Sequence, residues 1–162
     1  MSRIFHPDPA EQARRSRVTS SPDGANRPLT QRPPSDSSFE EILPFRTDAE
    51  LRDRYLNFFG ELRLGKLLED FDLTAGRVAY NHAEGWERGL TIVTAACDRI
   101  DLLGELHSDR DLRVRASVNW TGRSSMEVGL QVASEDDHGG WQPVARAYFI
   151  MVARQGDAAA PV

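Results

Sequence analysis

The sequence predicts an α+β domain, in which one long helix packs on an antiparallel sheet. Apolar residues recur with a helical period from about Leu64 to His82, and Gly85 follows as a stop signal. The period then changes to two residues in four successive segments, which are separated by turn-like stretches. One helix followed by a run of long strands is typical of this fold class.

Each of the four later segments is long enough to form a strand. They read GLTIVTAACDRIDLL, LRVRASVNW, SMEVGLQVAS and PVARAYFIMVAR. The second and third alternate apolar and polar residues, which predicts one buried and one exposed face. The fourth is almost continuously apolar, which predicts a strand covered on both faces. Cys97 alternates with Val93 and Ala95 in the first segment, so we expect its side chain in the core.

The residues before the helix divide into a tail and an approach to the domain. Residues 1–38 hold most of the prolines and few large apolar side chains, which predicts a disordered tail. The stretches FEEILPF and DAELRDRYLNFF predict a short helix or turn that leads to Gly60. We therefore place the folded domain at 39–156 and a second tail at 157–162.

Composition limits the classes of function. The chain has 162 residues, 40% of them apolar, and a net charge of -5, which argues against a nucleic-acid partner. The single cysteine excludes a disulfide framework and a cysteine-rich zinc site, and no histidine pair has metal-ligand spacing. No apolar run is long enough to cross a bilayer, and the first residues lack a signal-peptide core. These features predict a cytoplasmic protein with no metal and no membrane partner.

The predicted helix carries an acid beside small residues. Its apolar face is formed by Leu64, Leu67, Leu68, Phe71, Ala75 and Val78. Asp72 lies at the edge of this face, in a strip that contains Gly65 and Gly76. A glycine within a helix costs about 0.5–1 kcal/mol relative to alanine, so close helix packing or the approach of a ligand or partner must explain Gly76. We interpret Glu69 and Asp70 as solvated or paired acids, with Asp70 on the outer face.

The start of the helix offers a second chemical element. Backbone N–H groups around Arg63 to Lys66 are free at the positive end of the helix dipole. Gly65 lets an oxygen approach this backbone, which suits an oxyanion formed during acyl transfer. Asn57 would donate a hydrogen bond or orient a water, and Glu61 is a second carboxylate nearby. From the residues alone, a structural role for Glu61, as an acid stabilised by the helix dipole, is the favoured interpretation.

The order Asn57, Gly60, Arg63, Gly65 and Asp72 resembles the active-site segment of hotdog-fold acyl-CoA thioesterases. The match extends over most of the chain from about Arg54 to Arg154. Four blocks in the same order resemble the brown-fat-inducible and mitochondrial acyl-CoA thioesterase group: YLNFFGELRLGKLLEDFDLTAGRVAYNHA, TIVTAACDRIDL, VNWTGRSSMEV and YFIMVAR.

The resemblance implies a hotdog fold and hydrolysis of an acyl-CoA thioester to free acid and CoA. It implies that Gly65 supplies the oxyanion N–H and that Asp72 or Glu61 activates water or attacks the thioester. No cofactor is implied, since CoA is part of the substrate. Arg63 and Leu64 replace a His-Gly pair found in the phenylacetate-pathway branch, so no histidine role is carried over. Many relatives hold two hotdog units and this chain holds one, which implies a homodimer or a higher even oligomer.

CoA phosphates require positive or hydrogen-bonding groups. Arg123, Ser124 and Ser125 lie in the turn-like stretch TGRSS and are predicted to bind them, together with Arg63 and Lys66. An ordinary turn with an exposed arginine is the structural alternative for the TGRSS stretch. The alternative function is a non-catalytic acyl-CoA-binding hotdog module. A hydratase is disfavoured, because no histidine is placed near the helix to act in one.

Overall fold

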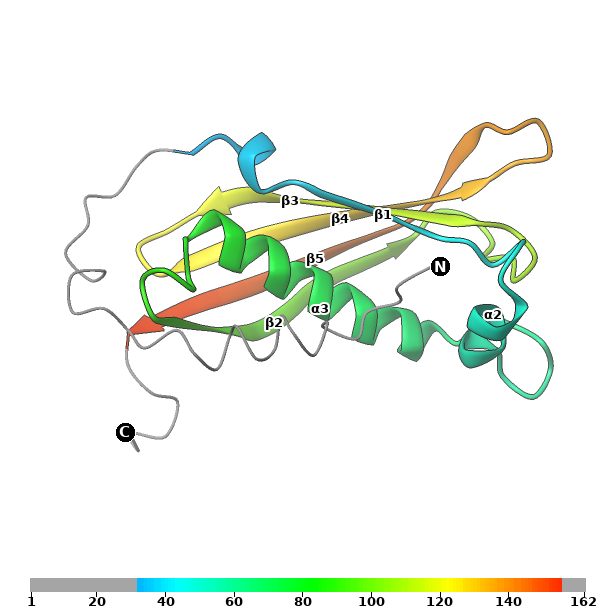
Figure 1. Cartoon of the computed structure of the whole chain (residues 1–162), viewed down its shortest axis with the longest axis horizontal. Coiled ribbons are helices and arrows are strands. Elements are labelled where there is room, and N and C mark those ends of the chain that lie inside the picture. The colour runs from blue at the N-terminus through cyan, green and yellow to red at the C-terminus, as the bar shows by residue number, and fades with distance from the viewer. Residues whose placement is uncertain (1–31, 156–162) are drawn as a thin grey trace.

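The computed structural model describes residues 32–155, and these form a five-stranded sheet with one long helix across one face (Figure 1). The elements in chain order are η2 (Pro34–Ser37), β1 (Phe39–Leu43), α2 (Ala49–Tyr55), α3 (Leu64–His82), β2 (Leu90–Leu102), β3 (Leu112–Thr121), β4 (Ser125–Glu135) and β5 (Trp141–Gln155). The predicted α+β hotdog architecture and the bounds of the long helix are confirmed. Most of the predicted N-terminal tail and all of the C-terminal one lie outside the described residues.

The sheet has the strand order β1-β3-β4-β5-β2, and all neighbouring pairs are antiparallel. β3, β4 and β5 follow one another in the chain and form the centre. β1 and β2 form the two edges. β2 pairs only with β5 among the described strands, and bulges interrupt this pairing between Thr94 and Ala96 and between Cys97 and Arg99.

The core lies between α3 and the sheet. Alternate residues of β3 and β4 are buried on this face, and they meet buried residues of the helix. The strand residues are Leu112, Val114, Ala116, Val118, Met126, Val128, Leu130 and Val132, and the helix residues are Leu67, Phe71, Ala75, Val78 and Ala79. Each large apolar side chain buried in this way contributes about 1.5–3 kcal/mol. Leu64 and Leu68 are only half-buried at the margin of this core.

Three local predictions were wrong. Phe39–Leu43 is a strand rather than a helix or turn, because it pairs with β3 from Phe39–Ala116 to Leu43–Leu112. From Ala145 to Val152, β5 alternates between buried residues and half-buried or exposed ones, so α3 fully covers only one face of this stretch. Cys97 is exposed, because β2 is an edge strand whose bulges break the simple alternation.

No helix within residues 32–155 has both the length and the apolar character that crossing a membrane would require.

Candidate functional site

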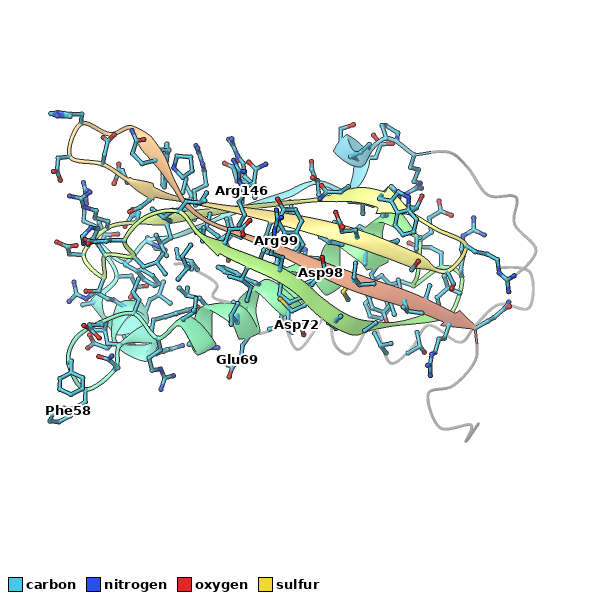
Figure 2. All side chains as sticks on the ribbon, turned by 180° about the vertical axis from the view of Figure 1, so that it is seen from behind. Phe58, Glu69, Asp72, Asp98, Arg99 and Arg146 are labelled. Atoms are coloured by element: carbon cyan, nitrogen blue, oxygen red, sulfur yellow. The ribbon has the colours of Figure 1, made fainter. Side chains whose placement is uncertain are left out.

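Asp72 lies where α3 passes β2. Its side chain is half-buried, and its Oδ1 accepts a hydrogen bond of 2.6 Å from Thr94 Oγ1. Figure 2 shows Asp72 beside β2, whereas Glu69, one turn earlier, points away from the sheet. Thr94 therefore holds one carboxylate oxygen of Asp72, and the other oxygen remains available to a water or a ligand. Sequence reasoning missed Thr94, because a threonine within a strand pattern carries no signal of its own.

Asn57 organises a small hairpin before α3. Its backbone N–H donates to the Glu61 carbonyl at 2.8 Å, and Arg63 N–H donates to the Tyr55 carbonyl at 2.7 Å. The Asn57 side-chain oxygen accepts from the N–H groups of Phe59 at 2.8 Å and Glu61 at 3.0 Å. Its amide nitrogen donates to Glu61 Oε2 at 3.0 Å. The structure thus brings Asn57 and Glu61 together, and it uses the Asn57 side chain to shape the turn.

We expect Asn57→Ala to lower turnover of a thioester, because the turn before α3 loses all three side-chain hydrogen bonds. Each neutral bond contributes about 0.5–1.5 kcal/mol, so the turn loosens while the buried core is untouched. Turnover and Tm of Asn57→Ala should be compared with those of Glu61→Gln. If Glu61→Gln is fully active and Asn57→Ala is not, the role of Asn57 does not depend on the Glu61 charge. Asn57 would then act by shaping the turn or by contacting the substrate itself. Full activity in Asn57→Ala would contradict the placement of Asn57 in the functional site.

The first turn of α3 is open at Gly65. The intrahelical ladder begins with the N–H groups of Lys66 and Leu67, which donate to the Arg63 carbonyl at 3.0 Å and 3.3 Å. The N–H groups of Leu64 and Gly65 precede this ladder, so they are free to meet a ligand. A Cβ atom added at Gly65 would meet no heavy atom within 4 Å. An incoming carbonyl oxygen therefore has direct access to this backbone.

Gly65 and Asp72 share one side of α3 but do not adjoin. Seven residues of helix separate them by about 10 Å along the axis. The turn between β3 and β4, which carries Arg123 and Ser124, lies beside the C-terminal end of α3 (Figure 1). Within one chain, the structure does not bring the predicted oxyanion group, the carboxylate and this turn together.

The acids of α3 correct one interpretation. Asp70 was placed on the outer face, yet it is only 8% exposed and accepts a hydrogen bond from the Tyr55 hydroxyl. It also binds Lys66 Nζ at 3.2 Å, and Lys66 reaches Glu69 at 3.1 Å. The prediction failed because Tyr55, the last residue of α2, reaches Asp70 and covers this side of the helix. Lys66, predicted to bind phosphate, is thus already paired within the chain.

Two other features do not form part of this site. A groove of about 830 Å³ lies on the opposite face of the sheet, around Arg115, Arg146 and Tyr148 (Figure 2 labels Arg146). It contains none of the predicted site residues and no group from α3. Among residues 32–155, no three His, Cys, Asp or Glu side chains are arranged to hold a metal ion.

Comparisons with known proteins find relatives of this chain among the thioesterases. The family model of the thioesterase superfamily matches residues 57–140, from the Asn57 turn through most of the sheet. A chloroplastic acyl-coenzyme A thioesterase of Humulus lupulus is 37% identical over 142 residues, covering 83% of this chain and 32% of its own. A mitochondrial acyl-coenzyme A thioesterase of Mus musculus is 36% identical over 137 residues, covering 82% and 31%. The chain thus spans about a third of the length of these relatives.

Solved structures give the same result. An acyl-CoA hydrolase of Staphylococcus aureus, solved with butyryl-coenzyme A and coenzyme A, has 26% identity and a TM-score of 0.64. The match covers 75% of this chain and 68% of that one. An acyl-CoA hydrolase of Bacillus cereus has 28% identity and a TM-score of 0.62, with coverage of 75% and 68%.

The names of the relatives overturn one prediction. Composition and the first residues led us to expect a cytoplasmic protein. The similar thioesterases of Humulus lupulus and Mus musculus are named mitochondrial or chloroplastic, which points to an organelle instead. The cytoplasmic prediction is therefore wrong, because the amino-acid composition of a domain does not determine its subcellular localisation.

The family model matches more than half of the chain. The matched segment contains α3, its open first turn and Asp72. The chain belongs to the thioesterase superfamily.

Proposed function

We propose that the chain hydrolyses an acyl-CoA thioester to a free acid and CoA, with Asp72 as the essential carboxylate. The observation that carries the proposal is the placement of Asp72, which Thr94 anchors at the junction of α3 and β2. A carboxylate at the rim of an apolar core is suited to activate water. The acyl-CoA thioesterases and hydrolases to which the chain is similar support this reaction class.

The staphylococcal hydrolase supports the choice of residues. It was solved as separate alanine mutants of an aspartate, an asparagine and a threonine. Its asparagine and aspartate are 15 positions apart, as are Asn57 and Asp72 in this chain. Its threonine follows the aspartate by 17 positions, whereas Thr94 follows Asp72 by 22. We infer from the shared spacing that Asn57 and Asp72 form the corresponding pair here, and Thr94 joins them on the evidence of its hydrogen bond to Asp72.

The proposed reaction proceeds by addition and elimination at the thioester carbon. A water loses a proton to the Asp72 carboxylate and forms the new C–O bond, and the carbonyl electrons move onto oxygen. The Gly65 N–H of a second copy stabilises this oxyanion, since Gly65 and Asp72 of one chain lie about 10 Å apart along α3. The C–S bond then breaks, and the CoA thiolate receives the proton. Direct attack by Asp72 would pass instead through an anhydride. Single-turnover hydrolysis in ¹⁸O-water would then label the Asp72 side chain when water attacks the Asp72 carbon, and the product acid when water attacks the acyl carbon.

We propose that two copies complete the site. Val93–Arg99 of the edge strand β2 are all exposed, and such an edge readily pairs with another strand. Antiparallel pairing of β2 with its copy would reverse the second subunit, so that the start of one α3 faces the end of the other. Arg123, Ser124 and Ser125 of one copy would then approach Arg63 and Lys66 of its partner. A homodimer or a higher even oligomer would thereby unite groups that are separated in one chain.

We expect Ala96→Arg to reduce both association and turnover, because a long charged side chain would stand on the β2 edge. Sedimentation should show at least twice the mass of one chain for the wild type and a shift toward the monomer for the variant. Arg115→Lys, a substitution on β3 far from this edge, is the control and should leave the mass unchanged. An unchanged oligomer in Ala96→Arg would contradict pairing through β2.

Release of thiol from short-, medium- and long-chain acyl-CoA esters tests the function directly. Turnover would support the hydrolase and rank the acyl chains. Binding of the esters without turnover would favour the alternative, a non-catalytic acyl-CoA-binding module.

A further inference from the structure

A buried polar cluster lies beside the start of α3, on the side away from Asp72. It consists of Tyr55, Lys66 and Asp70, and we call it the Tyr55 cluster. Tyr55 is 1% exposed, and its hydroxyl donates to Asp70 Oδ2. Lys66 Nζ binds Asp70 Oδ1 at 3.2 Å and lies 5.8 Å from the centre of the Tyr55 ring. Each member therefore contacts the other two.

The cluster keeps its charges satisfied within a mainly apolar setting. A buried carboxylate destabilises a fold unless it is paired and hydrogen-bonded, and Asp70 has both kinds of partner. Burial and the hydrogen bond to Asp70 raise the pKa of Tyr55 above its ordinary value, so the phenol stays protonated and donates. Burial also raises the pKa of the nearby Glu41, and the positive charge of Arg77 opposes this rise in pKa. The donor and acceptor roles in the cluster are thus fixed near neutral pH.

This arrangement braces the backbone around Gly65 from two sides. Tyr55 is the last residue of α2, and its carbonyl accepts the Arg63 N–H at 2.7 Å, directly before α3. Lys66 is the residue after Gly65, and Asp70 holds its ammonium one turn later. The Phe45 ring packs against Tyr55 at 4.9 Å and limits its movement. These contacts tie the end of α2 to the first turn of α3.

We infer that Tyr55 and Asp70 are positioning residues, which aim the Gly65 N–H at the thioester oxygen by fixing the first turn of α3. This inference rests on the proposed hydrolase function. Both side chains are buried, so we expect the loss of the Tyr55–Asp70 hydrogen bond to lower kcat and to leave KM for acyl-CoA little changed. Misplacement of a reacting group by about 1 Å lowers rates by about a hundredfold.

Tyr55→Phe, at the end of α2, tests the inference against a matched substitution on α3. It removes one hydroxyl and retains the ring. Tyr80→Phe makes the same change near the other end of α3, where the Tyr80 hydroxyl accepts the Ile92 N–H at 3.0 Å. We expect kcat to fall about ten- to a hundredfold in Tyr55→Phe, with KM little changed. Tyr80→Phe should lose comparable Tm and keep its kcat.

Hydrogen exchange provides a readout that does not depend on activity. We expect faster exchange in the peptide that covers residues 56–67 in Tyr55→Phe and no change there in Tyr80→Phe. If Tyr55→Phe is recovered in too little folded form, Asp70→Asn replaces it, since the amide still accepts from Tyr55 but releases Lys66. Asp70→Asn should lower kcat and speed exchange in the same peptide.

The two proposals fail in different ways. A wild-type protein that hydrolyses no acyl-CoA overturns the proposed function, whereas the exchange result still reports on the brace. Unchanged exchange at residues 56–67, or an equal loss of kcat in Tyr80→Phe, overturns the positioning role. A rise in KM with kcat retained in Tyr55→Phe also overturns it.

Discussion

Replacement of Asp72 by asparagine is expected to lower kcat for acyl-CoA hydrolysis by about 10²–10⁴-fold, the usual contribution of a positioned general base. Asparagine has nearly the same shape and can still accept the hydrogen bond from Thr94 Oγ1, which is 2.6 Å from Asp72. It cannot take a proton from water. Tm should therefore change little, and the loss should appear in kcat. Thiol release across the acyl-CoA panel, with CD and Tm for the fold, measures both.

Glu69→Gln is the matched control for this prediction. It removes a charge from the same helix, one turn earlier, where the side chain is 70% exposed and pairs only with Lys66 among the described residues. Such exposed pairs contribute little to stability, and Glu69 points away from the sheet (Figure 2). We expect it to retain kcat. Turnover that survives in Asp72→Asn would move the catalytic role to Glu61, which Glu61→Gln would then test.

Patterns within single elements predicted much of the fold. The helical period from Leu64 to His82 gave both bounds of α3 correctly. The two-residue period of β3 and β4 gave their buried faces except at Trp120, which is exposed after the bulge that follows Val118. These features succeed because each depends on the burial of one face, which the order of apolar residues records.

The failures involve contacts between distant segments. Asp70 is buried because Tyr55, fifteen positions earlier, folds over it, and no helical wheel contains that contact. Cys97 is exposed because β2 takes the edge position, which depends on the order of the strands. Thr94 became recognisable only when β2 was placed beside α3. Asn57, Gly65 and Asp72 were selected from the sequence by their local setting, and their catalytic roles remain predictions.

Gly65→Ala is expected to separate stability from catalysis. The added methyl group would meet nothing within 4 Å, and alanine favours a helix more than glycine does, so Tm should be unchanged or slightly raised. A Cβ atom in a helix tilts toward the N-terminus, which is the direction from which a thioester oxygen must approach the Gly65 N–H. Loss of an oxyanion donor costs about 10²–10³-fold, and we expect a crowded donor to cost at least about tenfold in kcat.

Gly76→Ala is the control for Gly65→Ala, because it adds the same methyl group to the middle of α3. There the new atom would approach only Met151 Cε, at 4.0 Å, so packing within one chain tolerates it. Its backbone N–H belongs to the helical ladder and stabilises no oxyanion. We expect Gly76→Ala to keep kcat and to gain about 0.5–1 kcal/mol of stability. Full kcat in Gly65→Ala would exclude an approach of the thioester along this backbone, whereas a loss of oligomer in Gly76→Ala would place the partner subunit against the strip of small residues on α3.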